Sequence, residues 1–165
     1  MNVDITLPDG SVRNYESPVT GYQIAESIGP RLLKDAICVE IDNKFQDLSY
    51  EISENINIRI VTTKDLDALH ILRHSSAHIL AQAVLNLYPN AQFGVGPSIE
   101  NGFYYDFLFE TPIKENELEN IEKEMKSIAK SAQSFIRSEI TKKDAVKIFR
   151  NQKLKLELIE SAESD

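Results

Sequence analysis

Apolar and polar residues alternate in three short runs within the first sixty positions, at residues 3–7, 37–41 and 56–60. Such alternation indicates β-strands with one buried face, because successive side chains of a strand point to opposite sides. A Pro-Asp-Gly turn at residues 8–10 follows the first run, and residues 12–16 can return beside it to complete a hairpin. Between this hairpin and the second run, residues 22–28 predict a short helix that ends at Gly29.

A hairpin, a helix and two further strands within about sixty residues is the element order of a ubiquitin-like β-grasp, an α+β fold. The order alone leaves the sheet topology open. We place a first domain at residues 1–62. Residues 62–65 are polar and form a short linker to the second region.

In the second region, residues 63–165, the character of the sequence changes. Residues 66–88 are rich in Leu, Ala and His and contain neither Gly nor Pro, which predicts a long helix. Glycine and proline punctuate the next part, where we expect strands at residues 92–97 and 102–109. Beyond them, the pattern predicts a helix at 118–132, a strand at 135–140, a helix from Thr141 to Phe149 and a final helical turn at 155–161.

Composition places the chain among ordinary globular proteins, with 42% apolar and 27% charged residues. No stretch approaches the roughly 18 consecutive apolar residues of a membrane helix, so we expect no membrane partner. The first residues lack the basic and apolar segments of a secretory signal. The single cysteine, Cys38, cannot form an internal disulfide, which fits a reducing compartment. We therefore expect a cytoplasmic protein.

A formal net charge of −8 argues against broad, non-specific binding of nucleic acid, which depends on neutralising phosphates. Residues 141–155 are a local exception, because six basic side chains stand there against Asp144 alone, a net charge of +5. A basic run of this kind is more often a solvated helix face than an RNA contact.

Chemistry-bearing side chains gather first in the sequence Arg-His-Ser-Ser-Ala-His at residues 73–78. His74 and His78 share one face of the predicted helix, with Cβ atoms about 5–6 Å apart, and His70 lies one turn before them. Two imidazoles in this position could converge on a metal, a water or a carbonyl group. From the spacing alone, structural histidines are the more common outcome.

Aromatic residues form a second cluster in Asn-Gly-Phe-Tyr-Tyr-Asp at residues 101–106. On a strand, Phe103 and Tyr105 would point one way and Tyr104 the other. We expect Phe103 in the core of a hairpin. Either tyrosine could offer its hydroxyl to a pocket.

The run RHSSAHILAQAV, followed by FGVGP and ENGFYYDF, closely resembles the opening of the proofreading domain of the threonyl-tRNA synthetase family. The region in front of it is similar to the TGS domain, a ubiquitin-like module. The His-x-x-x-His element is shared with alanyl-tRNA synthetase editing domains, but Gly-Phe-Tyr-Tyr-Asp at this distance is more specific. The resemblance implies an incomplete α+β editing domain at residues 63–165.

Post-transfer editing, the hydrolysis of mischarged seryl-tRNA(Thr), is the activity that this resemblance implies, with the acceptor end of tRNA(Thr) as partner. His74 and His78 match the family motif and would position water or substrate. Lys155 aligns best with a pocket lysine, although Lys153 is a competing alignment. Tyr104 would form a wall of the substrate pocket. His70 has no counterpart in the motif, and we treat it as a helix-surface residue.

The family completes its pocket with a Cys-x-x-x-His motif further along, which these 165 residues lack; Cys38 lies in the other domain with no histidine four positions later. Two of four expected pocket groups are therefore missing. The resemblance implies ATP and zinc only in an aminoacylation core that is also absent, so we expect no cofactor and no tightly bound metal here. We expect a fragment of a larger homodimeric enzyme, itself a monomer, with no aminoacylation and little or no editing.

Two alternatives remain open. A free-standing trans-editing hydrolase would need the missing Cys-x-x-x-His motif. A non-enzymatic TGS-type module that binds RNA or a protein partner would leave the His-x-x-x-His and Gly-Phe-Tyr-Tyr-Asp motifs unexplained.

Overall fold

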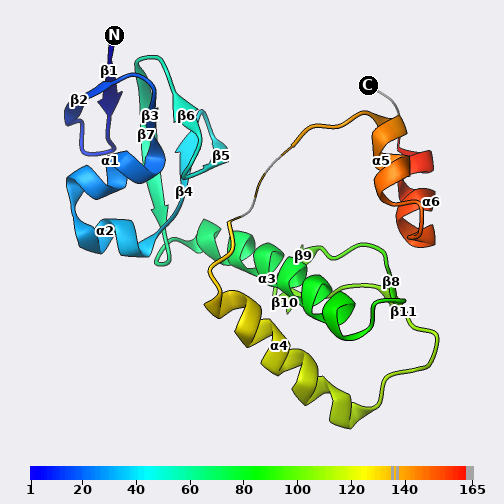
Figure 1. The fold of residues 1–165 in the computed structure, drawn as a ribbon. Coiled ribbons are helices and arrows are strands. Elements are labelled where there is room, and N and C mark those ends of the chain that lie inside the picture. Colours follow the sequence, from blue (N-terminus) through cyan, green and yellow to red (C-terminus); the bar gives the residue numbers. More distant parts are fainter. Residues whose placement is uncertain (135, 137, 163–165) are drawn as a thin grey trace. The chain divides into compact units, whose positions relative to one another are not determined.

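The structure, a computed structural model, describes residues 1–134, 136 and 138–162. The chain divides into two compact units, Met1–Leu69 and His70–Asp165, and Figure 1 shows the elements of each. No helix in the described part of the chain is long and apolar enough to cross a membrane.

A mixed five-stranded sheet in the order β2-β1-β7-β4-β5 forms the first unit (Figure 1). Its strands are β1 (Asn2–Thr6), β2 (Val12–Glu16), β4 (Ala36–Ile41), β5 (Lys44–Asp47) and β7 (Ile56–Thr62). The first and last strands run parallel, with Ile5 opposite Ile56, and the other neighbours are antiparallel. Parallel pairing of β1 with β7 in the centre is the topology of a β-grasp, so the expected α+β fold class is confirmed.

Helix α1 (Gly21–Ile28) begins with a capping box, in which Thr20 accepts from the backbone N–H of Gln23 and Gln23 accepts from that of Thr20. A short helix that was not predicted, α2 (Pro30–Asp35), follows at once. Proline is favoured at the first position of a helix, so Pro30 begins α2 directly after Gly29, which caps the end of α1. Ile24 of α1 packs into the core of the sheet with the apolar side chains Val3, Ile5, Val19, Val39, Ile52 and Ile58.

The short pair β3 (Val19–Thr20) and β6 (Glu51–Ile52) was also not predicted. The polar linker is an ordered turn, because the backbone N–H and the hydroxyl of Thr62 both donate to Asp65. The two compact units meet at residues 69 and 70, inside α3 (Leu66–Leu87). The predicted domain boundary after residue 62 lies at the end of β7 and stays a prediction.

In the second unit, α3 packs beside α4 (Leu118–Lys130), which follows a 3-10 turn η1 (Glu115–Glu117). Figure 1 shows the two helices next to each other. Their shared core contains Ala83, Val84, Ala91, Ile121 and Ile128. Both helices were predicted, α3 from its composition and α4 from the helical spacing of its apolar residues.

Four two-residue strands replace the two longer strands that were expected here: β8 (Gln92–Phe93), β9 (Ser98–Ile99), β10 (Gly102–Phe103) and β11 (Phe107–Leu108). β8 pairs with β11, and β9 pairs with β10. The prediction of continuous strands was wrong because Gly94, Gly96 and Pro97 interrupt the ladder, and Pro97 has no N–H to donate.

Two helices complete the unit. α5 (Lys142–Ile148) starts at Thr141, which accepts from the backbone N–H of Asp144 as predicted. α6 (Lys153–Ser161) is a full helix rather than the expected final turn. Of the strand predicted at 135–140, residues 135 and 137 lie outside the described residues, and 136 and 138–140 are not in a strand.

Candidate active site

All three histidines of α3 are exposed, while Ala77 and Ala81 of the same helix are buried. The Nε2 atoms of His74 and His78 lie 3.1 Å apart. Their rings meet edge to face, with centroids separated by 4.6 Å and planes at 88°. The pair is therefore accessible to a ligand and is not sealed in the core.

At a nitrogen separation of 3.1 Å, one imidazole donates an N–H to the lone pair of the other, so the pair can share a proton. The pKa of His78 lies below its ordinary value, because partial burial disfavours its charged form and the charges of His74 and Lys155 add to that effect. His78 is therefore neutral near pH 7 and can accept a proton.

Lys155, in the first turn of α6, is half-buried against aromatic rings. Its Nζ atom lies 5.1 Å from the ring centroid of Phe93 and 6.0 Å from that of Tyr105. Burial lowers the pKa of this amino group. Lys153, by contrast, is exposed and is held through its backbone N–H. The structure thus brings Lys155, rather than Lys153, to the aromatic cluster and into the field of His78.

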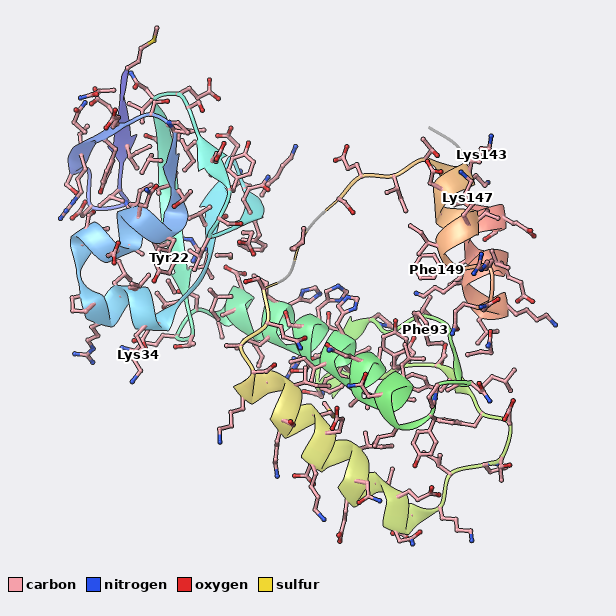
Figure 2. The ribbon with its side chains drawn as sticks, viewed as in Figure 1. Tyr22, Lys34, Phe93, Lys143, Lys147 and Phe149 are labelled. Atoms are coloured by element: carbon pink, nitrogen blue, oxygen red, sulfur yellow. The ribbon has the colours of Figure 1, made fainter. Side chains whose placement is uncertain are left out.

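The aromatic cluster joins three segments of the unit. Phe93 of β8 meets Phe149 of α5 edge to face, with centroids 6.3 Å apart, and Figure 2 shows these two side chains facing each other. Phe93 also lies 6.3 Å from Tyr105, which stacks on Phe107 at 5.1 Å. Burial raises the pKa of the Tyr105 hydroxyl. These contacts form a wall behind Lys155.

Tyr104, the tyrosine expected in the substrate pocket, is exposed at 46% of its surface, and its backbone N–H donates to Pro97 at 3.5 Å. Phe103 and Tyr105 are half-buried, in agreement with the expected alternation. The structure therefore places Tyr105, not Tyr104, beside Lys155. A role for Tyr104 in substrate binding stays a prediction.

Two further side chains of α3 hold the turn between β9 and β10. His70 shares a hydrogen bond of 2.8 Å between its Nε2 and the hydroxyl of Ser98. Arg73 donates from Nη1 to the carbonyl groups of Ile99 and Glu100. Sequence reasoning left His70 as a surface residue and gave Arg73 no role. Because His70 and Arg73 are three residues apart on a predicted helix, their sequence positions indicated that both could contact the same neighbouring segment.

Within residues 1–134, 136 and 138–162 there is no group of three or more His, Cys, Asp or Glu side chains that could hold a metal ion. The expectations that this chain binds neither a metal nor a cofactor stay predictions.

Part of the basic stretch 141–155 is engaged inside the unit. Lys142 donates to the carbonyl groups of Glu160 and Ala162 at the end of α6, and Lys147 pairs with Asp144 at 2.8 Å. Lys143 and Lys147 project from α5 in Figure 2. Lys143, Arg150 and Lys153 are exposed and remain available to a partner.

Comparison with known proteins gives a family match in the first unit and relatives for nearly the whole chain. The TGS domain family matches residues 3–62. A threonine–tRNA ligase from Francisella philomiragia is 47% identical over 165 residues, which cover 99% of this chain and 26% of that protein. Threonine–tRNA ligases from Paraburkholderia phytofirmans and Ralstonia nicotianae are 48% and 46% identical and cover 96% and 99% of this chain.

The chain thus spans about a quarter of the length of these relatives, 25% of the Paraburkholderia and 26% of the Ralstonia protein. A chain from the crystal structure of ATBAG1 in complex with HSP70 can be superposed on all of it, but the TM-score of 0.29 at 11% identity is too low to relate the two folds. This chain therefore carries a TGS domain and corresponds, over nearly its whole length, to the N-terminal region of threonine–tRNA ligases.

Proposed function

We propose that residues 63–165 form the N-terminal part of a domain that hydrolyses seryl-tRNA(Thr), within an enzyme that attaches threonine to tRNA(Thr) with ATP in the cytoplasm. The observation that carries the proposal is the exposed imidazole pair of His74 and His78, in which the pKa of His78 is lowered in part by the charge of the half-buried Lys155. Identity of 47% to a threonine–tRNA ligase over 99% of the chain supports the enzyme family.

Such an enzyme needs a second site, because serine is smaller than threonine by one methyl group. A missing methylene changes binding by only about 1–3 kcal/mol, so a synthetic site that accepts threonine also admits serine. A hydrolytic pocket that excludes the extra methyl removes the error. The substrate is therefore an ester between a seryl group and a ribose hydroxyl at the acceptor end.

In the proposed reaction, a water oxygen attacks the ester carbonyl and the ribose oxygen leaves with a proton. His78, held neutral by its surroundings, accepts a proton from the water, and His74 receives or returns it across the 3.1 Å contact. Lys155 donates hydrogen bonds to the oxygen that becomes negative in the transition state. Its place against Phe93 keeps water away from one side of the amino group.

We assign ATP, zinc and the homodimer interface to parts of the enzyme outside these residues. Cys38 is the only cysteine of the chain and is buried in the first unit. A Cys-x-x-x-His pair, which completes this kind of pocket in the resembling family, is therefore not supplied here. We propose that the 165 residues alone hydrolyse seryl-tRNA(Thr) barely faster than buffer does. Robust turnover by the purified chain would refute this part of the proposal.

The decisive experiment uses a full-length threonine–tRNA ligase that carries these 165 residues. His74→Ala and His78→Ala should let seryl-tRNA(Thr) accumulate while the rate of threonylation stays largely unchanged. His70→Gln is the matched control, because it removes the third imidazole of α3 but keeps a polar side chain that can still bond to the Ser98 hydroxyl. Equal loss of editing and threonylation would assign His74 and His78 a structural role instead.

The exposed cations of the stretch 141–155 are the proposed contact for tRNA. Charge reversal at Lys143 and Arg150 should weaken tRNA binding and reduce its dependence on salt, since each lost phosphate contact lowers the slope by about one. Reversal at Lys123, an exposed lysine of α4, is the control. If the tRNA affinity of the Lys143 and Arg150 variant depended on salt as it does in the original protein, these side chains would not contact tRNA.

A further inference from the structure

Gln92 lies on β8 and Gln152 directly precedes α6. The side chain of each glutamine forms hydrogen bonds with the backbone of the two residues that flank the other glutamine. Gln92 accepts from the backbone N–H of Lys153 at 2.6 Å and donates to the carbonyl of Asn151 at 3.0 Å. Gln152 accepts from the backbone N–H of Phe93 at 3.2 Å and donates to the carbonyl of Ala91 at 3.2 Å. Both amides therefore use their donor and their acceptor on the opposite segment.

We propose that this pair, the glutamine clasp, positions Lys155 for the reaction by fixing the first turn of α6 against β8. The inference rests on the proposed function, in which Lys155 acts on the substrate. Gln92 and Gln152 do not touch substrate in this proposal. They act through the lysine.

Geometry makes the clasp a positioning device rather than one more surface contact. Lys153, which the clasp holds, is the first residue of α6, and Lys155 lies two residues further in the same turn. Gln152, the residue before α6, forms no side-chain cap on its own helix. Gln92 supplies that cap from β8 instead, because its oxygen accepts from the first N–H of α6.

The same strand that supplies the cap also supplies the ring against which Lys155 lies. Phe93 follows Gln92 directly, and its backbone N–H is bound by Gln152 while its ring lies 5.1 Å from the Lys155 amino group. A rotation of α6 would therefore break the hydrogen bonds and the ring contact together. Displacements of about 1 Å at a reacting group can cost on the order of a hundredfold in rate, so such a device matters for catalysis.

Nuclear magnetic resonance of the 165-residue chain tests the position of Lys155 without any tRNA. The Phe93 ring should shift the Lys155 Hε resonances upfield. Gln152→Met and Gln92→Met keep side-chain volume but remove the hydrogen bonds, and each should abolish most of that shift. Gln133→Met is the matched control, because it removes one amide hydrogen bond, to Gln82 at 2.9 Å, elsewhere in the unit.

A further variant keeps the test informative if a methionine variant does not fold. Gln92→Glu retains the acceptor for the N–H of Lys153 at a helix N-terminus but loses the donor to the Asn151 carbonyl, so it should retain only part of the ring shift. A folded Gln92→Met or Gln152→Met chain with an unchanged Lys155 shift would overturn the proposal. So would equal loss of the shift in Gln133→Met.

Deacylation of seryl-tRNA(Thr) by the full-length enzyme tests the consequence. Gln152→Met should slow it roughly ten- to hundredfold and leave threonylation unchanged. If Lys155→Ala abolishes deacylation and Gln152→Met leaves it at the original rate, the positioning role is overturned. If Lys155→Ala itself changes nothing, the error lies in the proposed function, and the ring shift still reports whether the clasp holds the lysine.

Discussion

The ring of Tyr105 occupies the space that a side chain at position 96 would need. A Cβ atom added to Gly96 would lie 2.1 Å from Cδ2 and 2.4 Å from Cε2 of that ring. Phe107 stacks on Tyr105 at 5.1 Å, so the ring has little room to retreat. Close approach, rather than an unusual backbone conformation, therefore requires glycine at this position.

Gly96→Ala should lower the free energy of unfolding by about 1–3 kcal/mol, because the added methyl forces Tyr105 out of a packed cluster. Urea denaturation followed by far-UV circular dichroism measures this change. The matched control is Gly102→Ala, since a Cβ at position 102 has no heavy atom within 4 Å. Equal destabilisation by both substitutions would show that loss of backbone freedom, not the Tyr105 ring, explains the effect.

His78 should titrate below its ordinary pKa of 6.5, because partial burial and the charges of His74 and Lys155 disfavour its protonated form. Lys155→Met removes one of those charges and should raise the pKa of His78, as measured from its imidazole resonances. Lys153→Met removes an exposed charge two residues away and should leave it unchanged. A Lys155→Met chain with an unaltered His78 titration would contradict the proximity of the two groups.

The same pKa difference affects stability. Since the folded-state pKa of His78 is depressed, the unfolded chain binds a proton first as the pH falls. Stability from this group is complete above about pH 6.5 and declines as the pH drops through the folded-state pKa. His78→Gln should flatten this part of the stability profile. A profile that stays unchanged would mean that His78 has the same pKa in both states.

Periodicity predicted β1, β4, β7 and α4 well, because each of them buries one regular face, whereas α3 was predicted from its composition. The alternating runs around Ile5, Val39 and Ile58 became β1, β4 and β7, whose inward side chains form one core. The short elements could not be predicted in this way. α2 has no buried residue, and β8 to β11 are two residues long, so neither produces a period.

In the candidate site, too, local contacts could be predicted from the sequence and contacts between distant segments could not. The pairing of His74 with His78 follows from one helical turn and could be predicted from spacing. The choice between Tyr104 and Tyr105 could not, because it depends on the broken strand and on the space beside Gly96. The contacts of Gln92 and Gln152 join segments about sixty residues apart, so no local sequence pattern predicts them.

Cys38 should resist alkylation in the folded chain. It is 5% exposed, and burial raises the pKa of its thiol to about 11, from 9.0. The fraction of reactive thiolate at pH 8 is therefore about a hundredfold smaller than in the unfolded chain. Iodoacetamide labelling followed by mass spectrometry should show slow modification in buffer and fast modification in urea. Equal rates in the two conditions would contradict the burial of Cys38 in β4.

Arg59 connects three carboxylates at the junction between the sheet and the first turn of α3. Its guanidinium lies 2.5 Å from Glu40, 3.0 Å from Asp65 and 2.7 Å from Asp67. Hydrogen bonds to Asp67 and Glu40 are the main reasons that the pKa of Arg59 is raised above its ordinary value. Asp67 also lies in the first turn of α3, where a negative charge is favoured.

Arg59→Met should lower the free energy of unfolding by about 1–3 kcal/mol, because it leaves two half-buried carboxylates and Asp67 without their cation. The side chain of Arg59 is 33% exposed, so part of the effect should disappear in 1 M salt. Arg13→Met is the control, since Arg13 makes one long hydrogen bond of 3.4 Å to Ser27. Denaturation in urea at low and high salt separates the two contributions. If Arg59→Met were no more destabilising than Arg13→Met at low salt, the three ion pairs would be solvated surface contacts that add little to the stability of the protein.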